Sequence, residues 1–170
     1  FITKFARYYT PAVVLAAVAL TIFVAESQIP PVVPMPGVKL GLANIVTLVA
    51  MVLLGRRDAL AVLAARLILG AAFTGGFSAF MFSAVGGLFA YIVMAALVGV
   101  FPEKMLWVVS VLAALAHNAG QILVAVFVTG TPGIAVYILI LAASGVVTGA
   151  FTGLAGMFLI RAVRKSGLLK

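Results

Sequence analysis

Apolar residues form six long runs along this chain, and short breaks at proline, glycine and charged residues separate the runs. The breaks divide the sequence into the segments 9–27, 38–55, 58–73, 79–100, 105–128 and 133–160. A helix that crosses a bilayer needs roughly 20 mostly apolar residues, and the runs are close to that length. The pattern therefore predicts about six membrane-spanning α-helices in a single transmembrane domain that covers residues 1–170.

The runs favour helices over a membrane β-barrel because they are continuous and do not alternate between apolar and polar residues. Backbone groups in lipid must also be hydrogen-bonded within their own segment. The composition agrees, since 66% of the residues are hydrophobic and only 8% are charged, whereas about one quarter are charged in a soluble domain. We therefore expect an all-α integral membrane protein. The absence of cysteine excludes disulfides and thiolate metal sites.

Most basic residues lie in alternate connections between the runs, which predicts how the chain is oriented. With six spans, the following residues fall on one side: Lys4, Arg7, Arg56, Arg57, Lys104, Arg161, Arg164, Lys165 and Lys170. The positive-inside rule makes that side cytoplasmic, so both termini are predicted to be cytoplasmic. The net charge of +8 does not indicate nucleic-acid binding, because that function needs basic side chains clustered in an exposed groove rather than at helix ends.

The connection between the first two runs is rich in proline. Pro30, Pro31, Pro34 and Pro36 hold this backbone extended and prevent the preceding helix from continuing. We expect an ordered flap on the external side, with Glu26 one turn before it. An ion pair between Glu26 and Lys39 across the flap is an alternative to a gating role.

Two basic residues lie outside the cytoplasmic group, and a charge near the bilayer centre costs about 2.5 kcal/mol or more. Arg66 lies about eight residues into its run, so we expect it to face a polar internal cavity. A structural bond to carbonyl groups or lipid phosphate is the alternative. Lys39 lies at the external start of its run, where it either extends to the lipid headgroups or binds a ligand.

The fifth run carries three polar residues, His117, Asn118 and Gln121, whose spacing places them close to one helical face. Such residues either bond neighbouring helices or face a ligand. Asn44, five residues after Lys39, is a similar donor and acceptor. The candidate substrate-binding residues are therefore Lys39, Asn44, Arg66, His117, Asn118 and Gln121.

Glycines in the last run predict packing rather than chemistry. Gly145, Gly149 and Gly153 recur at four-residue spacing, which is typical of close helix contacts in membranes. Catalytic motifs are missing: the three acidic residues are dispersed, and no Gly-x-x-x-x-Gly-Lys phosphate loop is present. We therefore expect no enzyme activity from this chain alone, and no metal or cofactor.

Two stretches carry a resemblance to a known family. Residues 36–45, Pro-Gly-Val-Lys-Leu-Gly-Leu-Ala-Asn-Ile, run on to Gly55, and residues 75–78 are followed by 82–88 and Met94. They resemble the family described either as Gx transporter or as heptaprenyl diphosphate synthase component I. The arrangement is also similar to the S components of energy-coupling factor transporters, six-helix proteins whose flap closes over a vitamin. That likeness implies that Ala12 and Ala16 contact a transmembrane coupling subunit.

Two functions follow from the resemblance and the residues together. The first is an S-component-like subunit that takes up a small anionic solute, such as a vitamin or precursor, with energy from separate cytoplasmic ATPases. The second is a membrane accessory subunit for heptaprenyl diphosphate synthesis or prenyl-phosphate handling, which would bind a diphosphate at the same cations. A helical scaffold without a ligand is a third interpretation. In each case the family implies a bacterial cytoplasmic membrane, and the partners are the lipid bilayer, a ligand and other subunits.

Overall fold

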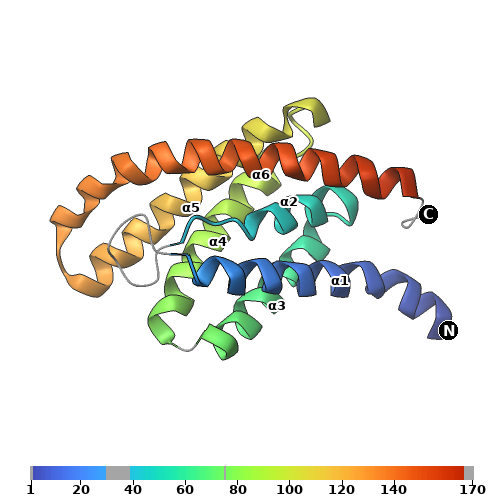
Figure 1. Ribbon diagram of the computed structural model, residues 1–170, viewed down its shortest axis with the longest axis horizontal. Helices are drawn as coiled ribbons and strands as arrows, with labels where there is room; N and C mark the ends of the chain where they lie inside the picture. The colour runs from blue at the N-terminus through green and yellow to red at the C-terminus, as the bar shows by residue number, and fades with distance from the viewer. Residues whose placement is uncertain (1, 30–38, 75, 167–170) are drawn as a thin grey trace.

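The computed structural model describes the backbone of residues 2–29, 39–74 and 76–166, and helices dominate this part of the chain (Figure 1). The α-helices are α1 (Ile2–Ser27), α2 (Asn44–Leu53), α3 (Arg56–Thr74), α4 (Phe77–Leu97), α5 (Leu106–Thr129) and α6 (Ile138–Ser166). Short 3-10 helices, η1 (Glu103–Met105) and η2 (Pro132–Tyr137), precede α5 and α6. The predicted all-α fold with six helices is confirmed.

Four helical segments are long and apolar enough to cross a bilayer: Thr10–Ser27, Phe77–Leu97, Glu103–Thr129 and Pro132–Ser166. Their outer surfaces carry large apolar side chains, and Phe77, Phe127 and Leu139 are each more than 70% exposed. Apolar side chains exposed in this way along long helices suit contact with lipid. These features identify a membrane protein.

The second helix differs from its prediction. Residues 38–55 were expected to form one span, but α2 contains only ten residues, Asn44–Leu53, and measures about 15 Å, half the hydrocarbon thickness. Its end is set by Gly55, which has a φ of 100° and donates its N–H to the carbonyl of Ala50 at 3.1 Å. Because most of α2 is buried among other helices, the protein rather than lipid surrounds the non-helical backbone before it.

The last three helices pack most closely, and glycine permits this contact. A Cβ atom at Gly153 would lie 2.5 Å from Trp107 Cα, and one at Gly149 would lie 2.6 Å from Val111 Cα. A Cβ atom at Gly120 of α5 would lie 3.1 Å from Gly86 Cα of α4. The predicted packing role of the α6 glycines is confirmed. By contrast, α1 packs mainly against α3 and α2.

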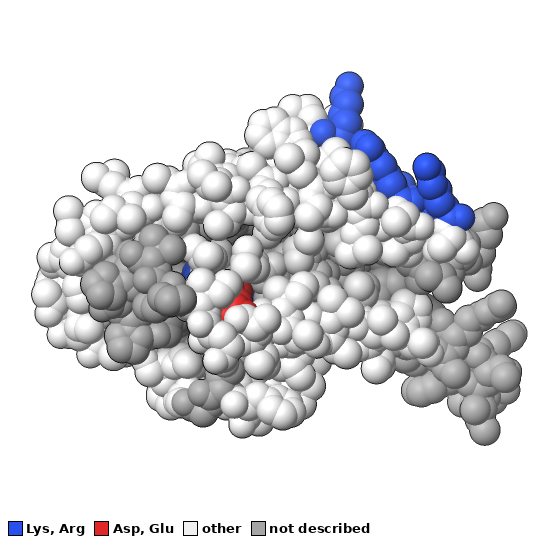
Figure 2. Space-filling view, in the orientation of Figure 1, with Lys and Arg blue, Asp and Glu red and all other residues white. Residues whose placement is uncertain are grey.

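Several connections with basic residues lie toward the same end of the bundle as both termini (Figure 1). Tyr91 Oη near the end of α4 donates a hydrogen bond to the Arg56 carbonyl at 3.0 Å, and Arg164 of α6 pairs with Glu103 of η1 at 2.5 Å. Lys and Arg side chains gather over the end of α6 in Figure 2. The side of the membrane that this end faces stays a prediction. The four prolines of the expected flap lie outside the described residues.

Candidate functional site: a buried cationic cavity

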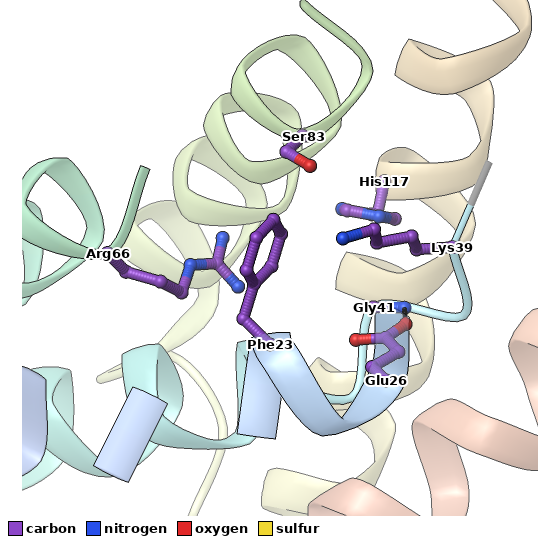
Figure 3. Close-up of a pocket in the computed structure, with 7 residues that line it drawn as sticks. All are labelled: Phe23, Glu26, Lys39, Gly41, Arg66, Ser83 and His117. Atoms are coloured by element: carbon purple, nitrogen blue, oxygen red, sulfur yellow. Dashed lines mark hydrogen bonds between the residues drawn. The ribbon is translucent and has the colours of Figure 1, made fainter. Parts of the chain in front are cut away.

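Five segments of the chain meet around a small internal cavity (Figure 3). The residues that line it are Phe23 and Glu26 of α1, Lys39 and Gly41 of the turn before α2, Arg66 of α3, Ser83 of α4 and His117 of α5. Its volume is about 10 Å³, which is about the minimum that one water molecule needs. Polar and charged groups therefore converge on a space that is almost closed.

Glu26 joins the end of α1 to the turn that precedes α2. Its Oε1 accepts the N–H of Gly41 at 2.5 Å, and the carboxylate is also hydrogen-bonded to the backbone of Leu42. Gly41 adopts a φ of 79°, a left-handed conformation that favours glycine. The carboxylate thus caps backbone donors at the start of a helix, where a negative charge is favourable. This contact positions Lys39 and Gly41 at the cavity.

The two cations of the cavity, the buried Arg66 and the half-buried Lys39 with its buried Nζ, have no ion-pair partner within the described residues. The ion pair found there joins Arg164 to Glu103, at the opposite end of the helices and exposed to solvent. Glu26 and Lys39, the alternative pairing predicted from the sequence, line the same cavity but form no direct ion pair there. Arg66 is only 2% exposed, and a buried charge is normally paired, but Arg66 forms no ion pair in the part of the chain that the structure describes.

Phe23 stands between the two cations instead. Lys39 Nζ lies 3.5 Å from the centroid of its ring, and Arg66 Cζ lies 5.8 Å from the same centroid. In Figure 3 the guanidinium lies on one side of the ring, and the ammonium and His117 lie on the other. A cation over an aromatic face is attracted by about 0.5–2 kcal/mol. The ring therefore compensates each charge only in part.

Several polar atoms at the cavity have no hydrogen-bond partner within the described part of the chain. They are Lys39 Nζ, Arg66 Nε, Ser83 Oγ and His117 Nε2. Buried polar groups are bonded in the great majority of cases, so unsatisfied donors gathered around one space are unusual. Two of these donors carry positive charge, and an anion would satisfy them with charge-assisted hydrogen bonds.

Glycines make room for the functional side chains. A Cβ atom at Gly41 would lie 3.2 Å from His117 Nε2, and one at Gly86 would lie 2.9 Å from Cε1 of the same ring. A Cβ at Gly87 would lie 3.0 Å from Arg66 Nη2. The His117 imidazole therefore packs between two of these glycines, and the Arg66 guanidinium packs against Gly87. These glycines belong to the two sequence stretches that carried the family resemblance.

The structure brings together three of the six predicted binding residues, Lys39, Arg66 and His117. Asn44 Nδ2 lies beside this group, since a Cβ at Gly41 would be 2.9 Å away from it. Asn118 instead donates to the Leu141 carbonyl of α6 at 2.5 Å, which is the interhelical role weighed as its alternative. Gln121 is fully buried and is not among the residues that line the cavity.

Sequence reasoning missed Phe23 and Ser83. Phe23 lies three residues before Glu26 and so shares its helical face, which is the one signal that could have found it. Ser83 is one of several small polar residues in an apolar run, and its place in the stretch 82–88 that carries the family resemblance is the feature that distinguishes it. Ala12 and Ala16 pack against the main core of the chain, and their contact with a partner helix stays a prediction.

Comparison with protein families gives one match. The model described as heptaprenyl diphosphate synthase component I matches residues 15–159, a range that contains every residue lining the cavity. Comparisons with curated proteins and with solved structures found no significant match.

Proposed function

Because the chain belongs to the heptaprenyl diphosphate synthase component I family, we propose that it is a membrane subunit that binds the anionic head of a prenyl diphosphate and works with a separate synthase component. The observation that carries this proposal is the pair of buried cations, Lys39 and Arg66, that line one cavity without an ion-pair partner in the described residues. Such a pair favours a ligand with more than one negative charge. The expected localisation is the bacterial cell membrane.

A surface groove also suits the apolar part of such a ligand. A groove of about 470 Å³ between α3 and α4 is lined by Ile68, Ala71, Gly76, Phe77 and Phe80. Binding sites for small molecules have volumes of about 300–1,000 Å³ and mostly apolar walls. The same two helices supply Arg66 and Ser83 to the cavity. An isoprenoid chain lying along this groove would contact the same two helices.

We further propose that the prenyl-transfer chemistry belongs to the partner. Prenyl transfer requires acidic residues grouped around divalent metal ions. The three acids of this chain are not grouped, since Glu26 lies at the cavity and caps the turn at Gly41, Glu103 pairs with Arg164 at the opposite end of the helices, and Asp58 lies in the first turn of α3. The role assigned to this chain is therefore to hold and present a ligand.

The test is to bind farnesyl diphosphate to the full chain in lipid nanodiscs. We expect Arg66→Gln and Lys39→Gln to weaken binding by about thirtyfold or more, since removing a buried charged partner costs about 2 kcal/mol or more. Arg57→Gln is the matched control because this residue is exposed on the same helix. Equal affinity in all four proteins would remove the proposed site. Co-purification with a soluble synthase, and prenyl-transfer activity that requires both, would test the partnership.

The S-component-like function is a second candidate, and one observation favours it. The cavity lies near the end of α1 and the start of α2, away from the end where the basic connections gather. If that basic end is cytoplasmic, the cavity is closer to the external side, as uptake of a solute requires. Native mass spectrometry of the gently released protein distinguishes the two: a retained prenyl diphosphate supports the first function, and a retained water-soluble carboxylate or phosphate supports the second.

A further inference from the structure

The Phe23 ring occupies the place where an anion would make its best contacts. It lies between Lys39 and Arg66, so any group that binds both cations at once must enter the space that the ring fills. The remaining cavity, about 10 Å³, is far below the volume of known ligand sites. A diphosphate therefore cannot bind both cations while the ring is in this position.

The position of the ring is set by close packing. A Cβ atom at Gly70 would lie 2.6 Å from Phe23 Cε1, so the ring edge rests directly on the backbone of α3, one turn after Arg66. Phe23 is only 4% exposed. The absence of a side chain at residue 70 thus permits the ring to lie beside the guanidinium.

An aromatic face is a weak substitute for a counter-ion. It attracts each cation but accepts no charge-assisted hydrogen bond, and Lys39 Nζ and Arg66 Nε have no hydrogen-bond partner in the described part of the chain. An anion in the same place would supply both charge and acceptor atoms. The two cations are therefore better satisfied by an anion than by the ring.

Resting on the anion-binding function proposed above, we propose that Phe23 is a plug that closes the cationic site of the empty protein and that the anionic head of the ligand displaces its ring. The ring keeps the buried cations shielded while no ligand is bound. Displacement lets Lys39 and Arg66 bind the same anion. Phe23 thereby lowers the apparent affinity, since only the open fraction of molecules binds.

The location of Phe23 allows this movement. Helix α1 packs mainly against α3 and α2, and much of its remaining surface is exposed. Glu26, one turn later on the same face, keeps the end of α1 attached to Gly41. A change in the Phe23 side chain can therefore open the site while the Glu26 contact holds the helix in place.

The test compares the binding of inorganic diphosphate to the wild-type chain and to Phe23→Leu in nanodiscs. Leucine retains an apolar side chain but has no aromatic face, and we expect binding to become about tenfold tighter as the closed state is lost. Phe23→Ala gives a second variant with the same expected direction. Phe127→Leu is the matched control, because Phe127 is 78% exposed on α5 and should leave affinity unchanged.

Each result bears on the proposal. Tighter binding in the Phe23 variants supports the plug, and so does binding that is detectable only in those variants. Unchanged or weaker binding in both, with normal binding by the wild type, overturns the plug and leaves the proposed function standing. If the wild type and all variants fail to bind diphosphate, the anion-binding function fails and the plug fails with it.

A second measurement needs no anion. The ring covers Lys39 Nζ at 3.5 Å, so an amine-acylating reagent should label Lys39 several-fold faster in Phe23→Ala than in the wild type. Peptide mass spectrometry gives the labelling rate, with exposed Lys104 as the internal reference. Equal rates at Lys39 would show that the ring does not shield the cation, which contradicts the plug directly.

Discussion

The two halves of this bundle, α5 with α6 and α1 with α2 and α3, differ in how they pack and in the polar groups that they bury. Between α5 and α6, glycines bring the backbones together, and Ser110 and Thr152 share a hydrogen bond at 3.0 Å. Around α1, α2 and α3, buried Lys39 and Arg66 lack ion-pair partners in the described residues. The first half is held by close backbone contacts, whereas the second contains two cations without an ion-pair partner in the described part of the chain.

That difference indicates where function lies. Unsatisfied buried groups destabilise a fold, and natural proteins retain them mainly where a ligand or a reaction needs them. The glycines of α4 connect the halves, because Gly86 packs near the α5 backbone and Gly87 leaves room for Arg66. We call α5 and α6 the rigid half, and α1, α2 and α3 the charged half. The charged half packs against the rigid half through α4.

The largest expected effect comes from disrupting the close contact between α5 and α6 in the rigid half. Gly153→Leu would place a side chain where even a Cβ lies 2.5 Å from Trp107 Cα, so α5 and α6 must separate. We expect a loss of about 3 kcal/mol or more in the free energy of unfolding, at or beyond the upper end for overpacking. Unfolding by SDS in mixed micelles measures it.

Gly133→Leu is the control for that change, because a Cβ atom at Gly133 meets nothing within 4 Å. Its effect should stay within about 0.5 kcal/mol. Equal effects of the two substitutions would mean that the α5–α6 contact is not the rigid part of the molecule.

The next effect has the opposite sign and concerns the charged half. Arg66→Met replaces a fully buried cation with an apolar side chain of similar length, and we expect stability to rise by about 1–3 kcal/mol while anion binding is lost. The same unfolding assay, run with Arg57→Met as the exposed control, measures the change. A loss of stability in Arg66→Met would instead identify Arg66 as a structural residue.

The sequence was sufficient to predict parts of both halves. Six apolar runs predicted six helices, and the glycine spacing predicted the close contact of α6, because both features depend on local patterns. Arg66 was predicted to face a cavity since its charge in lipid is costly. These predictions needed no knowledge of which helices are neighbours.

The rest depended on contacts between distant parts of the chain. Nothing in residues 38–55 reveals that α2 begins only at Asn44, because the turn before it is capped by Glu26 of another helix. Phe23 is one apolar residue among many in α1, and its position between two cations follows from the meeting of α1, α3 and the turn at Lys39. Asn118 was placed with the ligand because its helical face is shared, but the nearby Leu141 carbonyl accepts its proton.

The smallest effect measures how much one interhelical hydrogen bond stabilises the α5–α6 contact. Thr152 Oγ1 already donates its proton to the Thr148 carbonyl at 2.8 Å, so Ser110 must be the donor in the bond between their hydroxyls. A double-mutant cycle with Ser110→Ala and Thr152→Val should give a coupling energy of about 0.6 kcal/mol, the average for interhelical bonds in membranes. A coupling near zero would mean that this bond does not stabilise the α5–α6 contact and that close packing alone holds the rigid half together.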